Sequence, residues 1–191
     1  MRTHATLLPE KRLLAAFAHP DDESYGPCGT LKSVAEAAGG RVRLVVATRG
    51  EAASMGISRD YAPAQLARIR QAEMLAAAAV LGADVAFLGY PDKGLEATGP
   101  DVAVADLVRE IRLFQPAVLL TFHPNGLSGH PDHVAMTRYV REAFASAADP
   151  LFRPELGPAW RTGRLYYYAI SDSRAAALPW PRRLQSIPDS D

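Results

Sequence analysis

Short apolar runs alternate with helix-length segments along this chain, and this alternation constrains its fold most strongly. Each run ends at polar, proline or glycine residues, as a buried strand does where its loop begins. We predict strands over four of these runs, at Leu13–Phe17, Val42–Val46, Val85–Leu88 and Ala117–Thr121. Alternating strands and helices indicate an α/β fold with a mostly parallel sheet and helices on both faces.

The segments between and after these strands carry helix signals. Pro63 and Gly82 stand where a proline opens a helix and a glycine ends one. The predicted helices cover about Pro27–Ala38, Pro63 to just before Gly82, Val102–Phe114 and His133–Ala148. A late strand is predicted at Leu165–Ala169, and the Pro, Asn and Gly residues of 123–129 predict a loop.

Length and composition exclude several classes of protein. A chain of 191 residues is expected to form one domain, residues 1–191. The 21 Lys and Arg residues balance the 21 Asp and Glu residues, so nothing indicates a nucleic-acid partner. There is no membrane segment or secretion signal in the pattern, which makes a cytoplasmic location the expectation. Because Cys28 is the single cysteine, any metal must be bound by His and carboxylate groups.

Two motifs rich in His and Asp directly follow the first and fourth predicted strands. They read Ala18-His19-Pro20-Asp21-Asp22-Glu23 and Gly129-His130-Pro131-Asp132-His133. In parallel α/β sheets, ligands bind outside the carboxyl ends of the strands. A catalytic zinc takes three ligands from His and carboxylate groups and keeps one position open. His19, Asp22 and one histidine of the second motif supply such a set.

The remaining polar residues of the two motifs suit hydrolysis. Asp21 is left beside the metal set as a carboxylate that can take a proton from water. The second histidine of His130 and His133 can serve the developing oxyanion and the leaving group. Asp132 can hold that imidazole in its working tautomer.

Helix capping is an alternative explanation for each motif taken alone. Asp21 and Asp22 precede a predicted helix, where acidic side chains cap the first turn and stabilise the helix dipole without a metal. His130 and His133 can equally be an exposed pair at a helix start. Because both motifs follow strands, we favour a shared site over two independent caps.

Together the two motifs resemble the signature pair of the LmbE-like family. This family includes the PIG-L-type N-acetylglucosaminylphosphatidylinositol deacetylases and the mycothiol and bacillithiol biosynthetic deacetylases. The resemblance covers about residues 13–168 and implies a Rossmann-like, three-layer fold. It also implies one zinc per chain, or iron(II) in the cell, held by His19, Asp22 and His133.

The same resemblance assigns the catalytic roles. It implies that Asp21 is the general base and that His130 assists the oxyanion or the leaving amine. Asp132 is then the orienting partner of His130. Ser128 stands where the mycothiol-type members tend to carry a tyrosine that helps the oxyanion, and many relatives continue beyond the late strand of this chain.

Other residues match the substrate contacts of the family, namely Arg49, Glu51, Arg70 and Asp92. Charged groups such as Arg70 and Asp92 form strong, directional hydrogen bonds to sugar hydroxyls. Their alternatives are a surface pair of Arg70 with Glu73, a turn role for Asp92 and a solvated loop position for Arg49.

These residues predict a zinc-dependent hydrolase that removes an acetyl or other acyl group from an amino sugar, such as an N-acetylglucosamine conjugate. The alternatives are a metal-dependent phosphoesterase and a non-catalytic sugar-binding protein on the same fold. A nicotinamide-dependent enzyme is excluded, because His-Pro-Asp-Asp stands where a Gly-x-Gly-x-x-Gly loop belongs. We expect neither His4 nor His123 to bind the metal, and the resemblance suggests trimers or hexamers.

Overall fold

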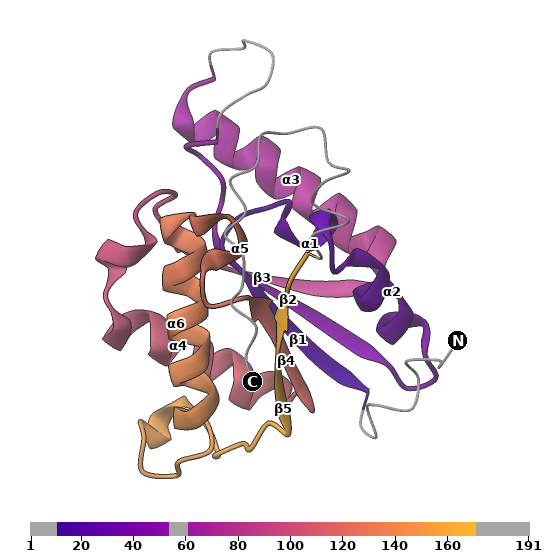
Figure 1. The fold of residues 1–191 in the computed structure, drawn as a ribbon, viewed down its shortest axis with the longest axis vertical. Coiled ribbons are helices and arrows are strands. Elements are labelled where there is room, and N and C mark those ends of the chain that lie inside the picture. The colour runs from indigo at the N-terminus through magenta and orange to yellow at the C-terminus, as the bar shows by residue number, and fades with distance from the viewer. Residues whose placement is uncertain (1–10, 54–60, 171–191) are drawn as a thin grey trace.

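The computed structural model describes residues 11–53 and 61–170. In these ranges the strands form one parallel, five-stranded sheet in the order β3-β2-β1-β4-β5 (Figure 1). The strands are β1 (Arg12–Phe17), β2 (Arg41–Thr48), β3 (Ala83–Tyr90), β4 (Val118–Phe122) and β5 (Arg164–Tyr168). The predicted α/β class is therefore confirmed, and the described sheet is parallel throughout.

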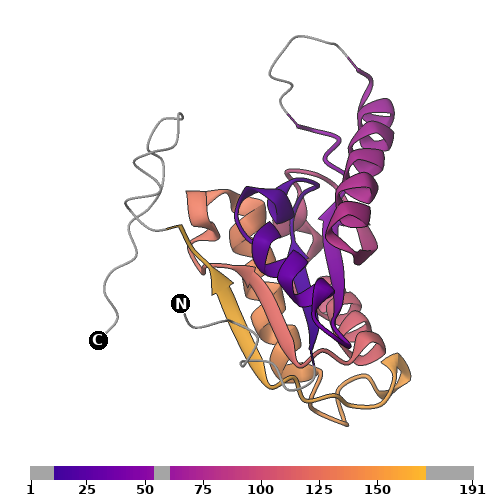
Figure 2. The same ribbon diagram turned by 90° about the vertical axis from the view of Figure 1, so that its right-hand side faces the viewer.

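Helices cover both faces of the sheet. Helices α2 and α3 pack on one face, and α4 and α6 pack together on the other (Figures 1 and 2). The described helices are α1 (Asp22–Tyr25), α2 (Cys28–Glu36), α3 (Pro63–Leu81), α4 (Pro100–Phe114), α5 (Gly126–Gly129) and α6 (Pro131–Ser146). Two 3-10 turns, η2 (Leu95–Thr98) and η3 (Pro154–Leu156), complete the described elements.

The strand order reverses between β1 and β4, and this reversal places the candidate site. The chain runs outward from β1 through β2 to β3, then returns to the other side of β1 as β4. Leu13 pairs with Val118 and Ala15 with Leu120, so the two strands end side by side. Their following loops must diverge toward opposite faces, which opens a crevice at the carboxyl ends.

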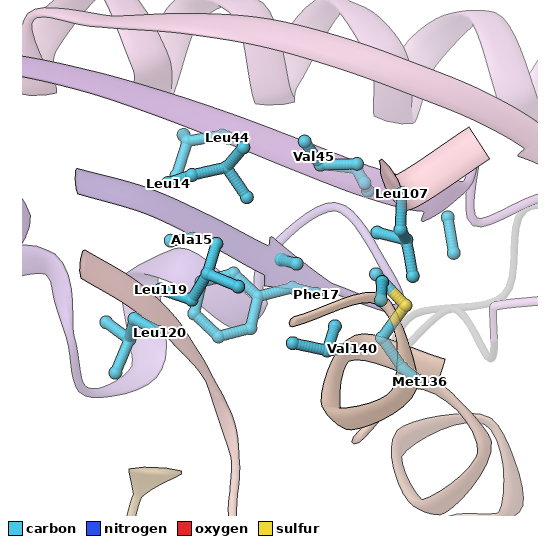
Figure 3. Packing of buried hydrophobic residues seen from close by; sticks show 14 of the residues in the cluster. Leu14, Ala15, Phe17, Leu44, Val45, Leu107, Leu119, Leu120, Met136 and Val140 are labelled. Carbon is cyan, nitrogen blue, oxygen red and sulfur yellow. The ribbon is translucent and has the colours of Figure 1, made fainter. Parts of the chain in front are cut away.

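A hydrophobic core fixes these strand ends. Phe17, the last residue of β1, packs edge-to-face on Phe122, the last residue of β4, with ring centroids 5.2 Å apart. Met136 and Val140 of α6 are buried in the same cluster (Figure 3). A buried Phe side chain contributes about 1.5–3 kcal/mol. The residues that follow each strand are therefore attached to a rigid base.

The predicted strands and helices are confirmed, with some ends shifted by a few residues, whereas the end of the predicted loop 123–129 forms the short helix α5. Helix α6 begins at Pro131 instead of His133, because proline suits the first helical position. The short helices α1 and α5 were not predicted, since four residues are too few to show helical periodicity. None of the described helices is long and apolar enough to span a membrane.

Candidate metal centre

Two histidines and one aspartate from distant segments meet at the carboxyl ends of β1 and β4. His19 follows β1, Asp22 begins α1 and His133 lies in the first turn of α6. Nδ1 of His19 is 3.3 Å from Nε2 of His133, which is 3.3 Å from Oδ1 of Asp22. Nδ1 of His19 is also 3.6 Å from Oδ2 of Asp22. The structure thus brings together the predicted ligand set.

The separations between these atoms fit a divalent metal. Ligands about 2.0–2.1 Å from a tetrahedral zinc lie about 3.3–3.4 Å from one another. Nδ1 of His19, Nε2 of His133 and the Asp22 carboxylate face one another, so their lone pairs can converge on one divalent cation. His19, Asp22 and His133 are accordingly one of the groups among the described residues that can hold a metal.

A second group of potential ligands overlaps the first and consists of His19, His130 and Asp132. The two groups share His19, and a neutral imidazole has one lone pair. His19 therefore serves one metal at a time while it stays neutral. In addition, Nδ1 of His130 already accepts the backbone N–H of Asp132 at 3.2 Å. We favour the first group.

His133 is oriented by contacts on both sides of its ring. Its Nδ1 lies 3.1 Å from the carbonyl oxygen of Gly126, which makes Nδ1 the protonated nitrogen. The ring stacks on Phe122, with centroids 4.0 Å apart and planes inclined by 4°. Metal-binding histidines commonly donate their outer N–H in this way, which fixes the tautomer. Nε2 of His133 is then free to face the metal position.

Asp132 makes different contacts from those expected of a partner of His130. Its buried carboxylate accepts hydrogen bonds from the backbone N–H of Lys93, at 2.7 Å, and of Leu95, at 3.2 Å. The same carboxylate lies 3.2 Å from Nε2 of His19. Asp132 reaches His130 through its backbone N–H, so His130 caps α6.

Asp21 has a strained backbone at the edge of the ligand set. Its φ of 122° is a conformation that non-glycine residues rarely adopt, and such strain concentrates at functional sites. The carboxylate of Glu23 accepts the backbone N–H of Asp21 at 3.0 Å, and Arg70 donates to the Asp21 carboxylate at 2.6 Å. No side-chain cap joins Asp21 to α1, so the capping alternative fails at this residue.

Burial and neighbouring charges shift the pKa values of the site. Burial and the charge of Asp22 raise the pKa of Asp21 to about 6, against the opposing effect of Arg70. Burial disfavours the charged form of His19, but hydrogen bonds to Asp22 and Asp92 raise its pKa to about 10. Burial lowers the pKa of His130 and His133, which favours their neutral forms.

A cavity of about 560 Å³ opens onto these residues. Its lining includes Asp21, Arg70, Asp92 and Ser128, but not the buried Asp132. Arg49 is exposed and lies outside this lining. These positions agree with a solvated loop position for Arg49.

Glu51 takes a supporting position instead of facing the cavity. Its carboxylate accepts the backbone N–H of Asp92 at 2.8 Å, and it is not among the cavity-lining residues. Arg70 also pairs with Glu73 at 2.6 Å, as expected for a helical pair, while its other nitrogen reaches Asp21. Arg70 thus combines the surface pair with a position in the site.

Several site residues were missed by sequence reasoning. Glu23 is buried and supports Asp21, and its place within the first motif was a signal that could have found it. Lys93, Tyr25 and Tyr168 line the cavity, but single Lys and Tyr residues carry no pattern that predicts this. His4 lies outside the described residues.

Comparison with known proteins gives the family. A family model described as PIG-L, GlcNAc-PI de-N-acetylase, matches residues 14–144, more than half of the chain. The chain belongs to the PIG-L family. One relative is the 1D-myo-inositol 2-acetamido-2-deoxy-alpha-D-glucopyranoside deacetylase of Streptomyces avermitilis. It is 38% identical to this PIG-L family member over 188 residues. The match covers 85% of this chain and 63% of that protein. The chain thus spans less than two thirds of the length of this relative.

Solved structures share the fold of this PIG-L family member. N,N'-diacetylchitobiose deacetylase from Pyrococcus horikoshii has a TM-score of 0.73 and 28% identity, covering 83% of this chain and 60% of that chain. The 4-carboxy-2-hydroxymuconate hydratase GalB of Pseudomonas putida KT2440 has a TM-score of 0.68 and 23% identity, covering 82% and 65%. The similarity to GalB shows the fold alone. Because a hydratase shares this fold, the reaction must be argued from the site.

Proposed function

We propose that this chain is a metal-dependent N-deacetylase that acts on an N-acetylglucosamine conjugate. One observation carries the proposal: His19, Asp22 and His133 converge in a cavity whose wall also holds Asp21 and His130. Such a site combines metal ligands with a proton acceptor and a hydrogen-bond donor. The names of the curated relative and of the Pyrococcus horikoshii protein support the same reaction.

His19, Asp22 and His133 would hold the metal, and zinc suits this ligand set of two nitrogens and one carboxylate. When bound, a divalent metal supplies a Lewis acid that makes water more acidic and polarises the amide carbonyl. The neutral state favoured for His133 and its fixed outer N–H keep one lone pair ready for this purpose.

In the proposed reaction Asp21 moves the proton, and His130 stabilises the oxyanion. A carboxylate oxygen of Asp21 takes a proton from the attacking water while a bond forms between the water oxygen and the acyl carbon. The Nε2–H of His130 donates a hydrogen bond to the oxyanion. Asp21 then returns its proton to the amide nitrogen as the carbon–nitrogen bond breaks, which releases a free amine and acetic acid, which ionises to acetate. Because Nδ1 of His130 accepts the backbone N–H of Asp132, Nε2 carries the proton.

The surrounding residues hold these groups in place. Arg70 donates to both Asp21 and the carbonyl oxygen of Pro20, so it fixes the proposed base on its strained turn. Of the proposed substrate contacts, Arg70 and Asp92 line the cavity and can face a sugar hydroxyl. Ser128 also lines the cavity and presents a short hydroxyl there.

Incubation of the metal-loaded chain with N-acetylglucosaminides tests the proposal. We expect equal amounts of acetate and free amine, and release roughly 10²–10⁴-fold slower by Asp21→Asn. A phosphodiester is the comparison substrate, because two-metal phosphoesterases need two ligand sets, and the two groups found here share His19. Phosphodiester cleavage without amide cleavage, or binding of the sugar without turnover, would overturn the proposed function.

A further inference from the structure

Nε2 of His19, the nitrogen that points away from Asp22 and His133, faces two carboxylates at once. It lies 3.2 Å from Oδ1 of Asp92 and 3.2 Å from Oδ2 of Asp132. Both acidic side chains are well buried, with 4% and 1% of their surface exposed. Neither residue belongs to the ligand set proposed above, so their shared position needs an explanation.

Each carboxylate is held by the main chain and does not depend on His19 for its position. Oδ2 of Asp92 accepts the backbone N–H of Ala52 at 2.9 Å, which ties the turn after β3 to the loop after β2. Asp132, in the first turn of α6, accepts the backbone N–H groups of Lys93 and Leu95. Two separate segments therefore present acceptors to one ring nitrogen.

A histidine that binds a metal is neutral. Its imidazole then has one N–H and one lone pair, so its two nitrogens have opposite roles. Two carboxylates on one side of His19 require the proton at Nε2. The lone pair must then lie at Nδ1, which faces Asp22 and His133 at 3.6 and 3.3 Å. The surroundings of His19 thus select a single tautomer and a single ring orientation.

We propose that Asp92 and Asp132 are positioning residues for His19, which fix Nδ1 as the metal-binding atom. Asp92 therefore acts on metal affinity, in addition to any contact it makes with a substrate. This inference rests on the metal site of the proposed function. Removing the outer acceptor of a metal-binding histidine typically weakens metal binding about 10- to 100-fold.

Asp92 gives the sharper test, because its side chain lines the cavity while Asp132 is buried in the core of the site. The zinc dissociation constants of the wild-type chain, Asp92→Ala and Asp92→Asn are measured by competition with a chromophoric chelator. We expect Asp92→Ala to raise Kd by about 10- to 100-fold and Asp92→Asn to raise it less, because its amide oxygen still accepts a hydrogen bond. Asp21→Asn is the control for the loss of one negative charge in the same cavity, and its Kd should stay within about twofold of wild type.

Two results would overturn the inference, and they differ in what else they affect. Wild-type zinc affinity in Asp92→Ala, together with a raised KM for the amide substrate, would make Asp92 a substrate contact alone. If Asp92→Ala fails to fold, as judged by its unfolding curve, Asp92→Asn replaces it in the test. Wild-type zinc affinity together with a raised KM in Asp92→Asn would then also make Asp92 a substrate contact alone. Absence of zinc binding by the wild-type chain would overturn the proposed function as well.

Discussion

Nδ1 of His19 lies 3.3 Å from Nε2 of His133, although the two residues are 114 positions apart in the chain. Their proximity follows from the strand order, because β1 and β4 are parallel neighbours and end side by side. The segments that follow them open on the same crevice. The candidate site therefore lies where the strand order reverses, between β1 and β4.

The neighbouring carboxylates Asp21 and Asp22 are expected to respond differently to the same change. Asp22→Asn removes a proposed ligand, so metal content and turnover should both fall, and excess zinc should partly restore turnover. Asp21→Asn should keep its metal but lose turnover by roughly 10²–10⁴-fold, the usual contribution of a positioned proton acceptor. Metal analysis and turnover are measured on the same preparations of both variants.

The capping alternative makes a different prediction for this pair. If both residues served only the helix dipole, each change to Asn would cost about 1 kcal/mol or less, and turnover would be unaffected. Normal turnover in Asp21→Asn would therefore contradict its role as the base. The structure already shows that the Asp21 side chain forms no cap, so we expect the first outcome.

The two histidines of the second motif provide a matched comparison. His133→Ala removes a proposed ligand whose ring is stacked on Phe122, and it should abolish stoichiometric metal binding. His130→Ala should retain close to one metal per chain and lose turnover by roughly 10²–10³-fold, because it removes a hydrogen-bond donor to the oxyanion. Metal content measured after dialysis distinguishes the two. Equal metal content in both variants would contradict the assignment of His133, instead of His130, as the metal ligand.

Much of this arrangement could be predicted from the sequence, for identifiable reasons. The runs of β1 and β4 are almost wholly apolar because both faces of a central parallel strand are covered, so the strands and the motifs after them were recognisable. The site roles of Asp92 and Asp132 could not be predicted in the same way. Both depend on which backbone N–H groups and which ring nitrogen each carboxylate meets, and this is set by the tertiary structure.

The raised pKa of Asp21 predicts how the stability of the metal-free protein depends on pH. Burial and Asp22 raise its folded pKa to about 6, above its ordinary value of 3.8, so folding favours the protonated form. The stabilising contribution of this carboxyl is therefore fully present below pH 3.8 and is lost as pH rises through about 6. In a chelating buffer at pH 8, Asp21→Asn should melt at a temperature no lower than wild type, because Asn carries no charge.

This expectation is checked by thermal unfolding of both proteins at pH 5 and pH 8. The difference in Tm, variant minus wild type, should be larger at pH 8, where the Asp21 of the wild type is charged. A variant that melts well below wild type at pH 8 would show that the ion pair with Arg70 outweighs burial and the repulsion from Asp22.

The burial of Arg112 could not be predicted from the periodicity of the sequence. It lies in the segment predicted as a helix from apolar spacing, and its charge suggests a solvated face, yet only 2% of its surface is exposed. Its guanidinium instead donates to backbone carbonyls at the end of α6 and in the segment after it, those of Ser146, Ala147, Asp149, Phe152, Arg153 and Gly157. Nothing in the local pattern could reveal acceptors that lie 34 or more positions away.

Replacement of Arg112 by Ala is therefore expected to destabilise the fold strongly. It leaves several carbonyl groups without their donor, and each buried group left unsatisfied costs about 1–3 kcal/mol. We expect a total loss of about 3 kcal/mol or more, which corresponds to a drop in Tm of roughly 6–12 °C for a chain of this size.

Arg109→Ala is the control on the same helix, because its side chain is half exposed and pairs with Asp106 at the surface. That change should alter stability by less than about 1 kcal/mol. If thermal unfolding gave Arg112→Ala the Tm of Arg109→Ala, water would have to satisfy the carbonyls, and the segment after α6 would not depend on the guanidinium.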